Sequence, residues 1–269
     1  MPGPPGTARA GPPHRPAPPG AGRPNRKDDA ALTTDRTDRT SPVVISGVSR
    51  GLGAALARRF AELGRPVAGC ARDRAALAAL RADLGPGHLV SAVDVTDADA
   101  VARWAAEVGE RLGAPGLVVA NAGHITAQAP VWEVPPAEFE HMMRVNVVGV
   151  YAMARAFLPL LGDGGTLVSV SSGWGRNPRG LLAAYTAAKF AVEGFTRAVA
   201  QETGALRPGV TAVSLDPGGG VDTDMLATCL PDEHSQYEGP REWALRAADY
   251  LLHHVPAAPN GAALTVPSG

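Results

Sequence analysis

A tyrosine and a lysine four residues apart are the first pair in this chain whose spacing could support chemistry. Tyr185 and Lys189 lie in AAYTAAKFAVEGFTRAVA, an alanine-rich stretch whose apolar spacing predicts a helix. On a helix, residues i and i+4 share one face, so the Lys189 ammonium can approach the Tyr185 phenol. A nearby cation lowers the pKa of a tyrosine, which makes it a better proton donor. The pair therefore indicates a general acid, although a half-buried tyrosine beside a solvated lysine would have the same spacing.

A glycine-rich loop upstream predicts a phosphate-binding site. The segment SGVSRGLG precedes AALARRFAEL, which has the composition of a helix. Gly47, Gly51 and Gly53 allow a tight turn and a close approach of backbone to a pyrophosphate, and the helix N-terminus offers unpaired N–H groups to it. A tight strand-to-helix connection that binds no ligand is the alternative.

Two arginines near this loop favour NADP over NAD. Arg72 stands in GCARD, at a position where an acidic residue would bind ribose hydroxyls and an arginine accommodates a 2′-phosphate. Arg50, inside the glycine loop, can reach the same phosphate. Either arginine alone could be an ordinary surface charge. Asp73, the neighbour of Arg72, is the residue that speaks against NADP.

The elements that must position these residues follow from the alternation of the sequence. From Pro42 onward, short β-branched runs alternate with helix-length segments. This pattern predicts an α/β protein with a single doubly wound parallel sheet, of Rossmann type and about seven strands, with helices on both faces. Ligands of such sheets bind at the carboxyl ends of the strands. The expected strands cover residues 43–46, 66–70, 89–93, 117–120, 166–170, 210–215 and 262–266.

Composition fits one soluble globular domain. The chain has 269 residues, 45% of them hydrophobic, and its formal net charge of −1 gives no electrostatic reason to expect a nucleic-acid partner. No segment has the roughly 18 uninterrupted apolar residues of a membrane span. Cys70 and Cys229 are too few for a disulfide framework and belong to no metal-type cluster, so we expect a cytoplasmic protein without a metal.

The first 41 residues differ from the rest of the chain. Residues 1–27 are rich in Pro, Gly and Arg and lack aromatic and β-branched aliphatic side chains. We predict a disordered tail over 1–41 and a folded NADP-binding domain over 42–269. The lack of an apolar core argues against a secretory signal; a shortage of acids suits a transit peptide, but the prolines oppose its amphipathic helix. An overextended start site is a further alternative.

Several ordered motifs resemble the short-chain dehydrogenase/reductase family from about Pro42 to the C-terminus. That family carries TGxxxGxG, a DVT-like segment, NNAG, an asparagine in the next helix, a serine after the fifth strand, and YxxxK. The corresponding strings here are SGVSRGLG, DVTD, ANAG, VNVVG, VSVSSGWG and YTAAK. Ala120 replaces the first asparagine of NNAG, and the family's PGxVxT is present as PGGGVDT, with one extra glycine.

The resemblance implies a catalytic set of Asn146, Ser172, Tyr185 and Lys189. Tyr185 would donate a proton to a carbonyl oxygen, and Ser172 would donate a hydrogen bond where negative charge develops. Lys189 is implied to hold the nicotinamide ribose hydroxyls as well, and Asn146 to hold a water that relays protons through Lys189. Ser171 is expected to be structural.

The resemblance also implies NADP(H) as cofactor and a small carbonyl compound or alcohol as substrate. Trp174, Met225 and Tyr237 are the candidates for substrate contact, although Trp174 could equally cap the core. The implied cofactor-binding residues are Gly47, Ser49, Arg50, Gly51, Leu52, Gly53, Arg72, Asp94, Val95, Asn121, Ala122, Gly123, Tyr185, Lys189, Pro217, Gly218 and Thr223.

The expected function is therefore an NADPH-dependent carbonyl reductase acting on an aldehyde or ketone. Longer strings such as WEVPPAEF and YEGPREWALRAA resemble the plant pterin aldehyde reductases of this family, which implies a pterin-type or other aromatic aldehyde. An alcohol dehydrogenase working in the oxidative direction and a non-catalytic NADP-binding redox sensor are the alternatives. A sensor would not need the four catalytic residues together. A homodimer or homotetramer is implied, since family members pair the helix that carries YxxxK with its copy.

Overall fold

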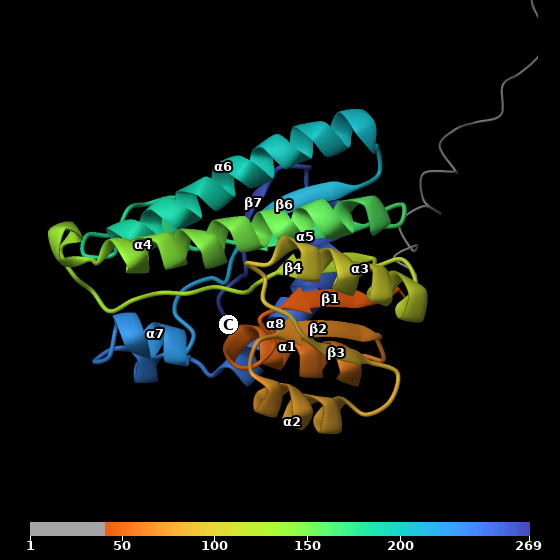
Figure 1. Cartoon of the computed structure of the whole chain (residues 1–269), viewed down its shortest axis with the longest axis horizontal. Helices are drawn as coiled ribbons and strands as arrows, with labels where there is room; N and C mark the ends of the chain where they lie inside the picture. The colour runs from red at the N-terminus through yellow and green to blue at the C-terminus, as the bar shows by residue number, and fades with distance from the viewer. Residues whose placement is uncertain (1–40) are drawn as a thin grey trace, which may run out of the picture. The chain divides into compact units, whose positions relative to one another are not determined.

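The computed structural model describes residues 41–269, which form one parallel sheet with helices on both faces (Figure 1). The strand order is β3-β2-β1-β4-β5-β6-β7, and every paired strand is parallel to its neighbour. This confirms the predicted fold class. The tail predicted over residues 1–41 lies outside the described residues except for Ser41, and that prediction stays open.

The strands lie where the β-branched runs predicted them, with ends shifted by at most one residue. All residues of β1, β2, β4 and β5 are buried, as expected of parallel strands covered on both faces, whereas the edge strands β3 and β7 are partly exposed. The strands are β1 Val43–Ser46, β2 Val67–Ala71, β3 Leu89–Ala92, β4 Leu117–Ala120, β5 Thr166–Val170, β6 Thr211–Asp216 and β7 Ala263–Thr265.

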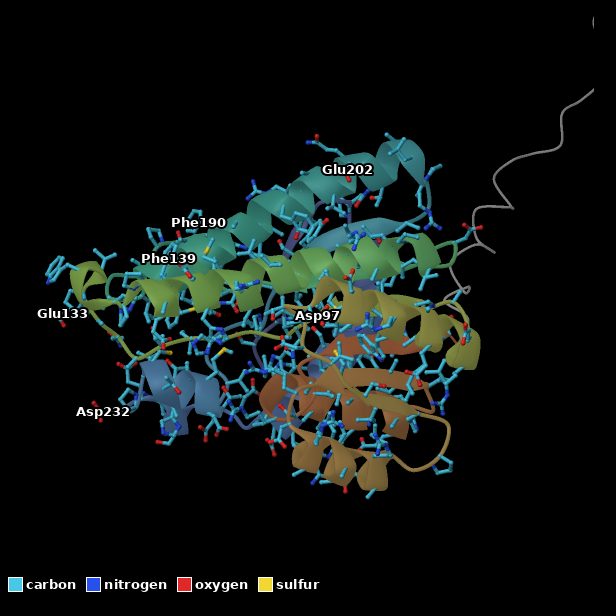
Figure 2. All side chains as sticks on the ribbon, in the orientation of Figure 1. Asp97, Glu133, Phe139, Phe190, Glu202 and Asp232 are labelled. Carbon is cyan, nitrogen blue, oxygen red and sulfur yellow. The ribbon has the colours of Figure 1, made fainter. Side chains whose placement is uncertain are left out.

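Helices connect the strands, and aspartates and glycines mark the ends of two of them. Asp73 and Asp97 cap the N-termini of α2 and α3 with their side chains, and Figure 2 shows Asp97 at the start of α3. Gly85 and Gly113 follow the same two helices with φ of 76° and 88°, a conformation that glycine adopts without steric cost. The helices are α1 Gly51–Glu62, α2 Arg74–Leu84, α3 Ala98–Leu112, α4 Pro136–Met143, α5 Gly149–Phe157, α6 Ala183–Leu206, α7 Asp224–Cys229 and α8 Pro240–Asp249.

Alternate residues of the sheet support two separate cores. Val43 and Ile45 of β1 pack on the face covered by α1, α2 and α8, whereas Val44 packs on the face covered by α3, α5 and α6. On the second face, Trp104 and Phe157 meet edge to face with ring centroids 5.1 Å apart. No helix within residues 41–269 combines the length and the apolar character that crossing a membrane requires.

The order in which strands are added to the sheet reverses between β1 and β4. From β1 the chain runs outward to β2 and β3, then returns to pair β4 with the other side of β1, with Val44 opposite Val118. The loops after β1 and β4 therefore diverge at one edge and leave a crevice between them, which is where ligands of this sheet type bind. Around the far end of that crevice, α4, α6 and α7 contribute to a third apolar cluster, which includes Tyr185 and Cys229.

Candidate active site

A cavity of about 460 Å³ opens at the carboxyl ends of the strands and gathers most of the predicted site residues. Those that line it are Gly47, Ser49, Arg50, Gly51, Leu52, Arg72, Asp94, Val95, Asn121, Ala122, Gly123, Tyr185, Lys189, Pro217, Thr223 and Met225. Those that do not line it are Gly53, Asn146, Ser172, Trp174, Gly218 and Tyr237. The sequence therefore located the cavity, and the predicted residues outside its lining stand next to it or elsewhere in the fold.

The glycine loop has the shape of an anion cradle. Gly47 has φ of 78°, and a Cβ there would lie 2.8 Å from the Ala122 Cα; a Cβ at Gly53 would collide with the Gly47 carbonyl oxygen. The loop ends in α1, whose first turn carries no acidic residue and whose N-cap, Arg50, makes no side-chain cap hydrogen bond. Free N–H groups and the positive end of the helix dipole thus face a space that only glycines leave open. These residues fit a dinucleotide pyrophosphate.

Ser46 joins the two loops that form the crevice. Its Oγ accepts hydrogen bonds from the backbone N–H groups of Asn121 and Ala122, both at 3.0 Å. In return, the Asn121 side chain donates to the carbonyl oxygens of Ser46 at 2.9 Å and Gly47 at 3.3 Å. The hydroxyl at position 46 is thus a structural tie between the ends of β1 and β4, a role that sequence reasoning missed.

Arg72 and Arg50 stand at the cavity edge, and Asp73 does not compete with them. The Asp73 carboxylate accepts hydrogen bonds from Ala75 N at 3.0 Å and Ala76 N at 3.1 Å, so it is directed into the first turn of α2. Arg50 lies 3.5 Å from Asp224, but both side chains are about three-quarters exposed, where ion pairs are weak. Two guanidinium groups therefore stand at the cavity edge where the sequence placed the 2′-phosphate.

Asp94, after β3, is held as a carboxylate. Burial raises its pKa, but two hydrogen bonds from Thr96, both 2.9 Å long, and the nearby charge of Arg72 outweigh that effect, so the net pKa lies below its ordinary value. The ionised side chain lines the cavity beside Val95.

Tyr185 and Lys189 are neighbours on α6, as their spacing predicted. Lys189 Nζ lies 5.5 Å from the centroid of the Tyr185 ring and donates to the Val170 carbonyl oxygen at 2.8 Å. Both side chains are buried, with 6% of Tyr185 and 4% of Lys189 exposed. The sequence indicated a solvated lysine only as an alternative, and the burial of Lys189 speaks against that alternative.

The electrostatics of this pair differ from the prediction. Burial raises the pKa of Tyr185 above its ordinary value, opposed by a hydrogen bond with the Ser172 side chain. Burial also lowers the pKa of Lys189 to about 8, opposed by the negative charge of Glu193. The net pKa of Tyr185 is therefore raised and not lowered as the sequence predicted, because the loss of hydration outweighs the effect of neighbouring groups.

The two serines after β5 differ in their surroundings. Ser172 begins a short 3-10 turn, Gly173–Gly175, and its Oγ accepts from Trp174 N at 3.2 Å. Ser171 lines the cavity instead, and its buried Oγ has no hydrogen-bond partner within residues 41–269. The sequence expected Ser171 to be structural, but Ser171 lines the cavity, while Ser172 forms a hydrogen bond with the side chain of Tyr185.

Asn146 is completely buried in a π-helical turn, Arg144–Val148, between α4 and α5. Its Oδ1 accepts from His124 N at 2.8 Å, and its Nδ2 donates to His124 O at 2.8 Å. Both ends of the amide thus bind the loop after β4. This fixes the loop that lines the cavity; the water relay implied by resemblance stays a prediction.

The extra glycine after β6 has a structural reason. Gly218 has φ of 83°, and a Cβ at Gly220 would lie 2.6 Å from the ring of Tyr237. The Trp243 indole N–H donates to Pro217 O at 2.8 Å and holds the start of this loop. Tyr237 therefore packs on the glycine backbone rather than lining the cavity.

The two remaining candidates for substrate contact differ in whether they line the cavity. Met225 lines the cavity. Trp174 does not line it, but its ring meets that of Tyr185 edge to face, with the centroids 6.1 Å apart. Of these two candidates, only Met225 therefore faces the cavity directly.

Sequence reasoning missed a set of lining residues that also follow strands. One of them is His124, whose ring lies 4.7 Å from that of His141 and whose pKa is lowered by burial. Its position directly after ANAG was the available signal. The missed residues are Ala71, Val93, His124, Ile125, Val145, Val170, Ser171, Asp224 and Thr228. In the described part of the chain, His, Cys, Asp and Glu side chains form no group that could hold a metal ion.

Comparisons with known proteins agree with this geometry. A family model described as short chain dehydrogenase matches residues 41–234. The chain is 40% identical over 228 residues to the NADPH-dependent pterin aldehyde reductase of Arabidopsis thaliana, covering 83% of this chain and 92% of that protein. It is 32% identical over 176 residues to the 2-dehydro-3-deoxy-L-rhamnonate dehydrogenase (NAD(+)) of Sphingomonas sp. (strain SKA58), covering 65% of this chain and 70% of that protein. The crystal structure of 3-ketoacyl-(acyl-carrier-protein) reductase from Brucella melitensis, complexed with NADH, superposes with a TM-score of 0.76 at 28% identity, covering 84% of this chain and 96% of that one.

Proposed function

The chain belongs to the short-chain dehydrogenase/reductase family, and from that membership we propose that it is an NADPH-dependent carbonyl reductase. Its substrate is a small aldehyde or ketone, of aromatic or pterin type. The observation that carries the proposal is that Tyr185 and Lys189 line the same cavity as the glycine loop and Arg72. A proton donor and a dinucleotide cradle in one cavity are what carbonyl reduction requires.

Reduction of a carbonyl needs a hydride at carbon and a proton at oxygen, and bound NADPH supplies the hydride. Tyr185 gives the proton, and Ser172 donates a hydrogen bond to the same oxygen as negative charge develops on it. The raised pKa of Tyr185 keeps the phenol protonated at neutral pH. An alkoxide is a stronger base than a phenolate, so proton transfer from the phenol to the reduced substrate is favourable even with that raised pKa.

Lys189 supports this role through its charge. With a pKa of about 8, the ammonium is mostly protonated below that pH. A positive charge next to the Tyr185 ring stabilises the phenolate that remains after proton transfer. Asn146 supports the site by holding the backbone of His124 at the cavity wall.

The preference for NADP rests on charge at the cavity edge. Arg72 and Arg50 can bind a 2′-phosphate, and the Asp73 carboxylate is occupied in capping α2. The name of the Arabidopsis relative, which specifies NADPH, supports the same choice.

Alcohol oxidation is the second candidate direction, because the Sphingomonas relative is named as an NAD(+) dehydrogenase. Oxidation needs Tyr185 as a base, in its phenolate form, whereas reduction needs the protonated phenol. We favour reduction because the Arabidopsis relative, at 40% identity, is named as a reductase. The homodimeric or homotetrameric state and the cytoplasmic location stay predictions.

The test is turnover by the purified chain with NADPH or NADH and a panel of benzaldehydes, a pterin aldehyde and small ketones. We expect consumption of NADPH with aromatic aldehydes, and much slower consumption of NADH. Tight NADPH binding without turnover of any carbonyl compound would favour the redox sensor. Faster oxidation of the matching alcohols with NADP+ at neutral pH would favour the dehydrogenase.

A further inference from the structure

We propose that Arg179 determines substrate specificity by binding an acceptor group, a carboxylate or a ring carbonyl, at the far end of a flat aromatic aldehyde. The proposal rests on the carbonyl reductase function above and names its substrate class more closely. Arg179 lies in the loop between the Gly173–Gly175 turn and α6, so it stands between Ser172 and Tyr185 in the chain.

Three side chains stand in a row at this end of the site. The Arg179 guanidinium carbon lies 6.0 Å from the centroid of the Trp174 ring, and that ring meets Tyr185 edge to face at 6.1 Å. Tyr185 lines the cavity, so it connects the indole and the guanidinium to the reacting centre. Trp174 and Arg179 stand next to this cavity rather than in its lining. A substrate with its carbonyl at the Tyr185 hydroxyl that extends past the cavity along the Trp174 ring would direct its far end toward Arg179.

The charge of Arg179 is not neutralised by a neighbour. Across residues 41–269 its guanidinium makes no ion pair and no hydrogen bond, and the Trp174 face is its contact. Arg176, three residues earlier, has partners for its guanidinium: it pairs with Glu193 at 3.0 Å and donates hydrogen bonds to Thr265 Oγ1 and to Leu264 O. A guanidinium that rests on an indole near a reacting centre is free to bind a ligand acceptor, and its planar fork suits a carboxylate.

The backbone of this loop is held in an unusual shape. Leu181, two residues after Arg179, has φ of 64° and is the only non-glycine residue with positive φ in the described chain. Leu181 O accepts from Ala129 N at 2.9 Å, and Arg179 N donates to Thr186 Oγ1 at 3.3 Å. Such strained residues cluster at ligand sites, where the surrounding structure holds them in place.

Arg179 is also close to the apolar cluster around Tyr185. The positive charge of Arg179 lowers the pKa of Cys229, although burial raises that pKa by more. Arg179 is therefore near Cys229, the last residue of α7. Cys229 packs in the same cluster as Tyr185 and Trp174. Arg179 is thus a cation at the edge of an apolar surface, the arrangement that recognises a flat ring carrying a polar end.

The experiment compares three aldehydes that differ only at the far end of the ring: 4-carboxybenzaldehyde, methyl 4-formylbenzoate and benzaldehyde. For the parent chain with NADPH, we expect kcat/KM to fall in that order. Arg179→Gln should lower kcat/KM for the carboxylate by roughly 10- to 100-fold, lower it less for the ester, and leave benzaldehyde nearly unchanged. Arg103→Gln, an exposed arginine on α3, is the matched control and should change none of them.

Binding gives a readout that does not depend on turnover. Calorimetric titration of 4-(hydroxymethyl)benzoate into the chain loaded with NADPH, with which the alcohol cannot react, should show weaker affinity in Arg179→Gln, by a similar factor. Equal losses for all three aldehydes, or unchanged carboxylate binding in the variant, would overturn the proposal for Arg179. Failure of the parent to reduce any of the three would instead overturn the carbonyl reductase function on which it rests.

Discussion

Glu193 lies one helical turn after Lys189 on α6, and both charged side chains are buried, with 1% and 4% exposed. Glu193 accepts from Arg176 Nε at 3.0 Å and from Ser214 Oγ at 2.7 Å, so its carboxylate is fixed in place. Its negative charge opposes the larger effect of burial, which leaves the pKa of Lys189 at about 8. Glu193 thereby favours the protonated form of Lys189.

Replacing this carboxylate should change the pH dependence of the enzyme. In Glu193→Gln, we expect the pKa of Lys189 to fall below that of the parent. The protonated fraction of a base declines as pH rises through its pKa, so turnover and NADPH affinity should decline at lower pH than in the parent. Measurements of kcat/KM and NADPH affinity between about pH 6 and 9 check this.

The control for that variant is Glu202→Gln, also on α6 but exposed (Figure 2). It should leave the pH profile unchanged. Glu193→Gln should also lower the free energy of unfolding by roughly 1–3 kcal/mol, because Arg176 loses its charged partner. Coincident pH profiles for Glu193→Gln and the parent would show that Glu193 acts only in stability.

A second prediction concerns cofactor choice. Arg72→Ala should reduce the preference for NADPH over NADH by about 10-fold or more, because charge-assisted contacts to a phosphate are strong. Affinity for NADH should change little. Fluorescence titrations with both cofactors check this, with Arg74→Ala, which does not line the cavity, as the matched control. Equal affinity of the parent for both cofactors would contradict the NADP assignment.

The neighbouring Asp73 should behave as a helix cap and nothing more. Asp73→Ala loses the hydrogen bonds to Ala75 N and Ala76 N, which should lower the free energy of unfolding by about 1 kcal/mol. Asp73→Ser keeps a capping oxygen and should retain most of that stability. Neither variant should alter the ratio of NADPH to NADH affinity; a shift toward NADPH would mean that the carboxylate faces the ribose.

These two residues show how far the sequence could go. The chain position after β2 predicted Arg72 at the cofactor edge, with Asp73 beside it as the residue that speaks against NADP; Arg72 lines the cavity and Asp73 does not. Which of them faces the cavity depends on side-chain direction, and the cap of α2 decides it. The strands were predictable for a simpler reason, since β-branched runs buried on both faces leave a clear signal in the sequence.

The properties of Tyr185 and Lys189 show where sequence reasoning ends. Helical spacing predicted that they would be neighbours, and they are. Helical spacing does not reveal how far the two side chains are buried, because that depends on the apolar residues of α4, α7 and the loops that pack around them. Burial has the largest effect on the pKa of both groups. Tyr237 was misplaced for a similar reason, because its contact with Gly220 joins segments that the sequence does not relate.

A fourth prediction tests the glycine cradle. Gly53→Ala places a methyl group against the Gly47 carbonyl oxygen and 2.6 Å from Asn121 Nδ2, so the loop must shift. We expect it to weaken NADPH binding severely and to lower the free energy of unfolding by roughly 1–3 kcal/mol. Gly109→Ala in α3, where a Cβ meets nothing within 4 Å, should instead stabilise the fold by about 0.5–1 kcal/mol. Unchanged NADPH affinity in Gly53→Ala would contradict the cradle.

The last prediction separates the roles of the pair on α6. Tyr185→Phe keeps the ring packed in its apolar cluster and removes only the hydroxyl, so the fold and NADPH affinity should survive while carbonyl reduction falls by roughly 10²–10⁴-fold. Lys189→Ala removes the ammonium that stabilises the phenolate and a group that can hold the ribose, so NADPH affinity and turnover should fall together. Fluorescence titration with NADPH and turnover of one accepted aldehyde, measured for both variants beside the parent, distinguish the two effects. If Tyr185→Phe kept near-parental turnover, Tyr185 would be an ordinary helix residue and the proton would have to come from another group at the cavity.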